Sequence, residues 1–343
     1  MNTNKRVTIK QVGKIAGVSI PTVSKVVNNR QDVSPETRER VKKVIKDMGY
    51  RPSALARSLS QQRSYTLGVV TVGLKYIGPS RTLSGITDKA REFGYALLLE
   101  EMDQFDTNNI FPPLQSLLAR HVDGIVWAVP EVGDNCSWVD DILNDAPVPV
   151  VFLTIQPRQG VSTVSVDNYR GGVLATQHLL NQGRRQIGHV SGPLGVWEAR
   201  QRKLAWQDTL KKAGIEATDS HCAEGDWSSR SGKMAFEKLL HSYPEMDAVF
   251  VANDQMALSV LQIAIRQKIA IPKDLAVVGY DNVDESEYYW PALTTMNLDQ
   301  HKLGCRAVEE VVHQIETVQH GEKIETQNIW LSPELVVRDS SVG

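Results

Sequence analysis

The first 50 residues carry apolar side chains at the spacing of short helices. Ile9, Val12 and Ala16 recur three or four positions apart, which predicts a first helix with one buried side. Thr8, with a glutamine three positions later, is a capping-box pattern for its start, and Gly17 can take the left-handed conformation that ends a helix.

Two more short helices are predicted directly after the first. The second follows a capping Ser19 and buries Val23 and Val26, and the third begins at residues 34–36 and ends at Gly49. Two small helices joined by a short turn that contains glycine are typical of a helix-turn-helix, whose second helix places its N-terminal turn in the major groove.

From residue 66 onward, short apolar runs alternate with amphipathic stretches. The expected strands are 67–72, 95–99, 124–129, 148–153, 187–190, 248–251 and 275–280. The expected helices include 80–93, 171–181, 199–213, 231–241 and 256–267. This alternation predicts parallel sheets with helices on both faces, and about 280 residues suit two lobes rather than one sheet.

Charge separates the two parts more sharply than the overall composition does. Residues 1–64 hold 14 Lys and Arg against four Asp and Glu, whereas residues 65–343 hold 24 against 36. A basic head on an acidic body indicates that only the head meets a polyanion, and the alternative is a solvated basic helical face.

Other functional classes receive little support from the chain. Cys136, Cys222 and Cys305 show no metal-finger spacing, residues 1–5 contain no apolar signal core, and no apolar stretch is long enough to span a membrane. We therefore expect a cytoplasmic protein. Phosphate-loop, nucleophile-elbow and zinc-protease motifs are missing from the sequence, so we expect no catalytic residue, metal or cofactor. A solute-binding protein is the rival class, and the basic head argues against it.

Side chains suited to a sugar follow the ends of expected strands in the body. Ligands of such folds bind beyond the carboxyl ends of the strands. Arg202, Trp227, Asn253 and Asp281 supply a guanidinium, an aromatic face, an amide and a carboxylate. Near them, Asp254 and Asn282 either cap helices or join the site, and Trp197 either lines the site or packs in the core.

Several motifs of the head resemble the LacI/GalR family of bacterial repressors. They are Val7-Thr-Ile-Lys-Gln-Val-Gly-Lys-Ile-Ala-Gly-Val-Ser, Thr22-Val-Ser-Lys-Val-Val-Asn-Asn, Val33-Ser-Pro-Glu-Thr-Arg-Glu-Arg-Val, Gly49-Tyr-Arg-Pro and Ala54-Leu-Ala-Arg-Ser-Leu. The resemblance covers essentially the whole chain. It implies an all-α, lambda-repressor-like helix-turn-helix head and an α/β, two-lobed, periplasmic-binding-protein-like sensor domain with parallel sheets.

The same resemblance implies which residues of the head meet DNA. Base reading is implied for Ile20, Pro21 and Lys25, and backbone contacts for Ser19, Thr22, Ser24 and Asn28; the DNA-binding set also includes Thr8 and Ala56. Two positions depart from many members of the family. Pro21 has no side-chain donor, and Lys25 stands where arginine is usual, so it lacks the bidentate fork.

The resemblance also implies the domain boundaries. Residues 1–51 form the DNA-binding domain, 52–60 a hinge helix and 61–343 the effector-binding and dimerisation domain. The hinge helix forms on DNA, and Leu59 wedges into the minor groove; the alternative is a plain linker. Lobe one takes about 65–165 and 293–327, and lobe two about 166–290 and 328–340.

In the body, the resemblance implies an effector cleft between the lobes. Its expected lining is Tyr76, Gly78, Pro79, Glu198, Arg202, Trp227, Asn253 and Asp281. The implied function is a repressor of carbohydrate utilisation that works as a homodimer on double-stranded palindromic operator DNA and responds to a mono- or oligosaccharide. Purine-responsive relatives remain the alternative, and no membrane is involved.

Overall fold

The computed structural model describes residues 7–27, 30, 32–50, 63–103, 111–139 and 146–342. The chain divides into two compact units, residues 1–65 and 66–343. The unit boundary therefore falls a few residues after the expected start of the effector domain at residue 61. The expected hinge helix, with Ala56 and Leu59, lies outside the described residues, and so does Asn28.

The N-terminal unit contains the three expected helices around a small apolar core. They are α1 (Ile9–Ala16), α2 (Ile20–Val27) and α3 (Pro35–Met48). The buried core consists of Val12, Ala16, Val23, Val26 and Val41. Left-handed glycines follow α1 and α3 at Gly17 and Gly49, as the sequence predicts.

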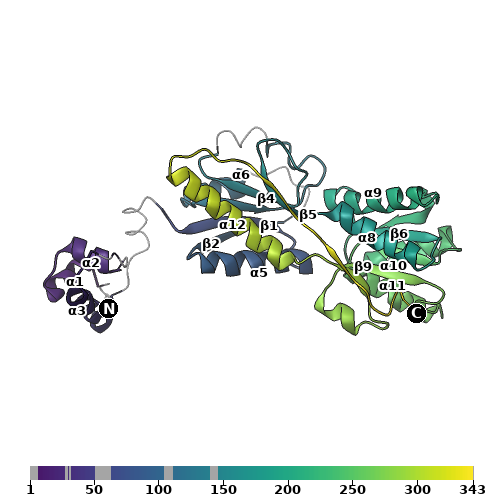
Figure 1. Cartoon of the computed structure of the whole chain (residues 1–343), viewed down its shortest axis with the longest axis horizontal. Helices are drawn as coiled ribbons and strands as arrows, with labels where there is room; N and C mark the ends of the chain where they lie inside the picture. The colour runs from purple at the N-terminus through teal and green to yellow at the C-terminus, as the bar shows by residue number, and fades with distance from the viewer. Residues whose placement is uncertain are drawn as a thin grey trace. The chain divides into compact units, whose positions relative to one another are not determined.

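The second unit contains two six-stranded sheets, each in its own lobe (Figure 1). Sheet one has the order β11-β5-β4-β3-β1-β2 and is parallel throughout. Its strands are β1 (Thr66–Val72), β2 (Ala96–Met102), β3 (Gly124–Ala128), β4 (Val150–Leu153), β5 (Ser162–Val166) and β11 (Asn328–Leu331). Sheet two has the order β12-β10-β9-β8-β6-β7, and only the β10–β12 pair is antiparallel. Its strands are β6 (Ile187–Ser191), β7 (Cys222–Glu224), β8 (Ala248–Val251), β9 (Ala276–Asp281), β10 (Thr294–Asn297) and β12 (Glu334–Val336).

Helices separate the strands in both lobes. Lobe one has α5 (Ile77–Glu92), α6 (Phe111–Ala119) and α12 (Gln300–Gln319). Lobe two has α8 (Asn168–Asn181), α9 (Trp197–Lys212), α10 (Ser229–Ser242) and α11 (Asp254–Arg266), with short 3-10 turns η1 (Asp219–His221) and η2 (Asp284–Tyr288). The alternation of strands and helices confirms the expected fold class.

The chain crosses between the lobes three times, and two crossings differ from the expected boundaries. β10 pairs with β9 in lobe two, although residues from 293 were expected in lobe one. β11 pairs with β5 in lobe one, although residues from 328 were expected in lobe two. Figure 1 shows this C-terminal segment, in yellow, passing from α12 to the second lobe. Thr294-Thr295-Met296-Asn297 has no continuous apolar run, so its strand could not be recognised from hydrophobicity.

No helix among the described residues is long and apolar enough to cross a membrane.

Candidate functional site

The first turn of α2 presents a polar and apolar surface that is open to solvent. Ser19 caps the helix, because its Oγ accepts the Thr22 backbone N–H at 3.3 Å and lies 2.9 Å from the Thr22 hydroxyl. Ile20, Pro21 and Lys25 are exposed. Pro21 and Lys25 lie four positions apart and therefore share one face of the helix.

The other predicted DNA-contacting residues of the head have defined local surroundings. Thr8 caps α1 in a complete capping box with Gln11, as the sequence predicts. Thr22 and Ser24 are half-buried beside the exposed row. The Lys25 ammonium lies 2.6 Å from the Asp32 carboxylate in an exposed ion pair. Such an exposed pair is weak in water, so Lys25 can exchange Asp32 for an acceptor on DNA at small cost.

A cavity of about 140 Å³ lies between the lobes of the second unit. All eight residues that the sequence assigns to the cleft line it: Tyr76, Gly78, Pro79, Glu198, Arg202, Trp227, Asn253 and Asp281. Lobe one contributes strand ends and the first turns of α5. Lobe two contributes α9 and the segments that follow β7, β8 and β9. The position agrees with the rule that ligands bind beyond the carboxyl ends of parallel strands.

Arg202 is held in one position by lobe two. Its side chain is 5% exposed; Nε donates to Asn168 Oδ1 at 2.8 Å, and Nη1 donates to the Ala252 carbonyl at 2.6 Å. The guanidinium also lies 3.8 Å from the centroid of the Tyr280 ring. An arginine has five N–H donors, so donors remain for a ligand after these two bonds.

Trp227 supplies the aromatic surface of the cavity. A Cβ on Gly192 would lie 2.1 Å from the indole, so glycine is needed there for the ring to fit. Asn253 Nδ2 donates to the Trp227 carbonyl at 3.0 Å, while Asn253 Oδ1 accepts the Met256 N–H and caps α11. Asn253 therefore positions the tryptophan as well as lining the cavity.

Two acids of the lining, Glu198 and Asp281, interact electrostatically with Arg202. Glu198 precedes Arg202 by one helical turn, and Asp281 ends β9. Burial raises the pKa of Glu198, and Arg202 opposes that shift. Burial also raises the pKa of Asp281 to about 8, again against the pull of Arg202. Both acids would gain from hydroxyl donors that stabilise their ionised forms.

Three cavity residues have backbones in the left-handed region, which side chains other than glycine rarely adopt. They are Thr154 (φ 59°), Trp227 (φ 74°) and Asp281 (φ 111°). Conformations of this kind cost of order 1–3 kcal/mol and persist at sites that the surrounding structure holds in place. The cavity is therefore pre-organised at three separate strand ends.

The open alternatives around the cleft are resolved by contacts. Asp254 is fully buried and accepts from the Val283 N–H and from the hydroxyls of Ser286 and Thr295, at 2.6–3.0 Å, so it is a structural carboxyl and Asn253 is the helix cap. Asn282 caps no helix; its Oδ1 accepts from Arg338 at 2.9 Å. Trp197 is buried, 6.2 Å from the Trp330 ring centroid, in the packing role.

Some residues of the site were not found from the sequence. Thr71 near the end of β1, Thr82 on α5 and Gln255 in the first turn of α11 also line the cavity. Asn168 and Tyr280, which hold Arg202, were missed as well. Asn168 begins α8 directly after β5, so recognition of that strand would have pointed to it.

Comparisons with known proteins agree with this architecture. The model for "Bacterial regulatory proteins, lacI family" matches residues 8–53, and the model for "Periplasmic binding protein-like domain" matches residues 176–341. The Ribose operon repressor of Escherichia coli (strain K12) is 32% identical over 97% of this chain and 99% of its own length.

The chain belongs to the LacI family of bacterial regulatory proteins. The HTH-type transcriptional repressor PurR of Haemophilus influenzae (strain PittEE) is 30% identical over 97% of this chain and 98% of its own length. A structure of the lac repressor dimer bound to operator and the anti-inducer ONPF superposes with a TM-score of 0.88 at 29% identity, covering 99% of this chain and all of that one. This LacI-family chain is thus a DNA-binding transcriptional regulator with an effector-binding domain.

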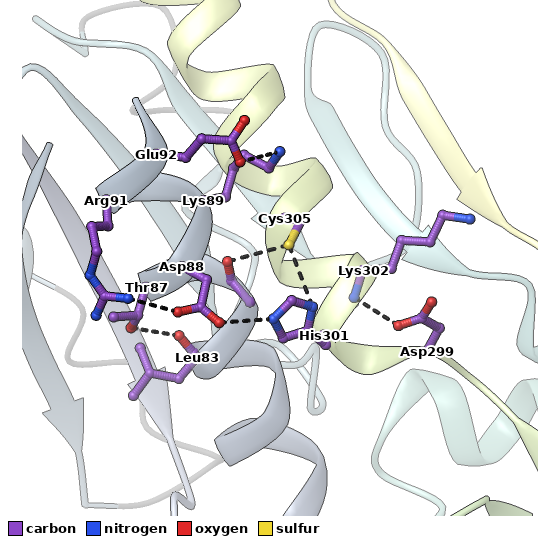
Figure 2. Close-up of polar contacts among 11 residues, drawn as sticks. Leu83, Thr87, Asp88, Lys89, Arg91, Glu92, Asp299, His301, Lys302 and Cys305 are labelled. Carbon is purple, nitrogen blue, oxygen red and sulfur yellow. Dashed lines mark hydrogen bonds and ion pairs between the residues drawn. The ribbon is translucent and has the colours of Figure 1, made fainter. Parts of the chain in front are cut away.

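A second polar cluster of this LacI-family regulator joins the helices that line the cavity from lobe one (Figure 2). His301 Nε2 lies 3.1 Å from Asp88 Oδ2, and its Nδ1 lies 3.6 Å from Cys305 Sγ. The order Cys305, His301, Asp88 resembles the nucleophile, base and acid of a catalytic triad. However, burial raises the pKa of the Cys305 thiol, and this thiol also donates to the Gly85 carbonyl at 3.5 Å. A Cβ on Gly85 would lie 1.9 Å from the His301 carbonyl oxygen, so α5 and α12 are in direct backbone contact. The cluster therefore has a structural role, because it holds α5 against α12.

Asp281→Asn should raise the stability of the protein at high pH and lower its affinity for the effector. In the folded regulator Asp281 keeps its proton up to pH about 8, while its ordinary pKa is 3.8. Its contribution to stability is therefore full below pH 4 and is lost as the pH rises through 8. We expect the melting temperatures of the two proteins to agree near pH 4 and the variant to melt at least about 2 °C higher at pH 9.

Thermal denaturation across this pH range measures the difference, in which the contribution of Asp254, present in both proteins, cancels. Effector affinity of the variant should fall at least about tenfold, because an amide accepts fewer hydroxyls than a carboxylate. A variant that is less stable at pH 9 would show that burial does not strain the Asp281 carboxylate.

Proposed function

We propose that this protein represses a carbohydrate-utilisation operon and that a sugar bound in the interlobe cavity alters its affinity for the operator. One observation carries the proposal: a single chain joins a helix-turn-helix head with an exposed recognition helix to a cavity lined by Arg202, Asp281 and Trp227. The head supplies DNA recognition, and the cavity supplies a small-molecule signal.

The chemistry of the cavity favours a sugar as the effector. Carboxyl, amide and guanidinium groups can bind hydroxyls, and the Trp227 indole can cover the C–H face of a sugar ring. A purine is the second candidate, supported by the similarity to the PurR repressor. Binding of purines but not of sugars by the pure protein would favour that second candidate.

Contacts across the rim of the cavity give a route from effector to DNA. Arg81 on α5 of lobe one lies 2.6 Å from the Asp284 carboxylate and donates to the Asn282 carbonyl at 3.1 Å, both in lobe two. Another contact between the lobes is backbone to backbone: the Trp197 main-chain N–H donates to the Glu131 main-chain carbonyl at 3.0 Å. A ligand that changes the angle between lobes changes these contacts, and the coupling arises from its different affinity for the two arrangements.

We propose that the active form is a homodimer on a palindromic operator, like the lac repressor dimer bound to its operator. Lobe two exposes large apolar side chains that suit such an association: Met234, Leu258, Ile265, Tyr288 and Trp290. The protein acts in the cytoplasm, where its DNA is found, and binds its effector without turnover.

Selection from random DNA duplexes tests the DNA-binding half of the proposal. Full-length protein should enrich one sequence with two-fold symmetry, and its affinity should fall steeply with salt as phosphate counterions are released. Lys25→Ala should lower the preference for one base pair in each half-site by about 1–3 kcal/mol. Enrichment of no symmetric sequence would contradict the proposal.

A further inference from the structure

A second cavity, of about 220 Å³, lies within lobe one and is lined by α6, β3 and β4. We call it the α6 cavity. Leu114 and Leu118 line it from α6, Trp127 from β3 and Phe152 from β4. Protein interiors are close-packed and contain few voids larger than a water molecule, so a space of this size within one lobe is unusual.

The α6 cavity is separate from the interlobe cavity. Its strand residues are two cross-strand pairs, Ile125 with Val150 and Trp127 with Phe152, which share one face of sheet one because alternate residues of a strand point the same way. The neighbouring residues of opposite parity, Ala128 and Leu153, line the interlobe cavity instead. Among the described residues, the two cavities have no lining residue in common.

The lining of the α6 cavity suits an uncharged, apolar occupant. Eleven of its twelve described lining residues are apolar, and the exception is Gln115. An ordered water needs two to four polar partners, and a sugar needs more, so one amide satisfies neither. An ion would lose its hydration without a charged partner among these residues. An apolar cavity of about 150 Å³ stays dry and binds benzene, so the α6 cavity is large enough for a ligand of that kind.

Three aromatic rings in the lining favour an aromatic ligand over an aliphatic one. The centroids of Trp127 and Trp138 are 4.8 Å apart with their planes at 65°, and Phe152 lies 5.8 Å from Trp138 at 48°. Rings in such edge-to-face arrangements attract each other beyond the effect of buried area. The Trp138 N–H is donated to the Asn135 carbonyl at 2.7 Å, so the polar edge of this ring already has its partner.

An exposed part of α6 gives access to the cavity. Phe111 and Gln115 line the cavity, lie one helical turn apart and are both exposed to solvent. We propose that lobe one binds a small uncharged arene in the α6 cavity, as a second ligand besides the effector of the interlobe cavity.

Calorimetric titration of the full-length protein with three six-membered rings tests the proposal. Benzene should bind with one-to-one stoichiometry and a dissociation constant below about 1 mM. Cyclohexane should bind at least about twofold more weakly, because it lacks the ring-to-ring attraction, and benzoate at least about tenfold more weakly, because its carboxylate would be buried without a partner. No binding of benzene, or equal binding of cyclohexane or benzoate, would overturn the proposal.

Two matched variants assign the site. Leu118→Trp on α6 places an indole in the α6 cavity and should lower benzene affinity at least about tenfold. Leu83→Trp on α5 makes the same change in the lining of the interlobe cavity, at a leucine that is also half-buried, and should leave benzene affinity within about twofold. A loss of affinity in Leu83→Trp instead would place benzene in the interlobe cavity and overturn the proposal.

Crystals of the unaltered protein soaked with iodobenzene give a second test that does not depend on the folding of a variant. The anomalous signal of iodine should lie beside Trp127 and Phe152, between α6 and sheet one. Iodine found only in the interlobe cavity or on the surface would overturn the proposal.

Discussion

Arg202→Ala is expected to lower effector affinity at least about 100-fold while operator affinity stays within about twofold. Among the described lining residues, this guanidinium is the one cation that can donate to a sugar, and hydrogen bonds from charged groups contribute about 1.5–3 kcal/mol each. Its loss also removes a donor from the Ala252 carbonyl and leaves Asn168 Oδ1 with only the Tyr280 hydroxyl, at 3.4 Å. Calorimetry with a binding sugar and operator titration of the same protein measure the two affinities.

Arg200→Ala is the matched control for this experiment. Arg200 lies on the same helix, donates to the Gly195 carbonyl at 2.6 Å and does not line the cavity. Its replacement should leave effector affinity within about threefold. Arg202→Lys, which keeps the charge but loses the planar fork, should fall between the two. Normal effector response by Arg202→Ala would show that the cavity is not the effector site.

Val12→Asp should abolish operator binding and leave the effector domain intact. Val12 is 0% exposed within a core of five buried side chains, so a carboxylate there would lose its water without a partner. A head this small cannot absorb a loss of several kcal/mol and should unfold. Operator affinity should then fall more than about 100-fold, in proportion to the folded fraction. In calorimetric unfolding of the variant, the transition of residues 66–343 should remain, and the effector should still shift its melting temperature.

Ile15→Asp provides the comparison within the same helix. Ile15 is 62% exposed, so the same charge should change the stability of the head by no more than about 0.5 kcal/mol. Retention of full operator affinity by Val12→Asp would contradict the assignment of DNA binding to the head. Loss of effector binding by Val12→Asp would contradict the independent folding of the two units.

The head and the cleft were predictable because their signals are local. Caps, glycine stops and three-residue spacing specify α1 to α3. In the cleft, Asp281 ends β9, Trp227 follows β7, and Arg202 lies on the helix after β6. Two of the five described strands that the sequence did not predict, β5 and β10, are rich in serine and threonine, whose burial depends on partners distant in sequence. Thr295, for example, donates to Asp254, 41 positions earlier. Neither alternative for Asp254, a helix cap or a site residue, agrees with the structure, for the same reason.

Long-range contacts also explain the shifted lobe boundaries. β11 is a peripheral strand with an alternating pattern of exposed and half-buried residues, so little in it distinguishes one lobe from the other. Its pairing with β5 is decided by the path of the chain after α12. Arg202 likewise has partners from two different parts of the chain, namely Asn168 and Tyr280.

The central claim is that a sugar in the cleft and an operator on the head bind the same protein with coupled free energies. The most direct measurement determines operator affinity with and without saturating sugar, and sugar affinity with and without saturating operator. The two ratios should be equal and differ from one by at least about fivefold, because coupling between sites is reciprocal. A sugar that binds in the cleft and leaves operator affinity unchanged would contradict the claim.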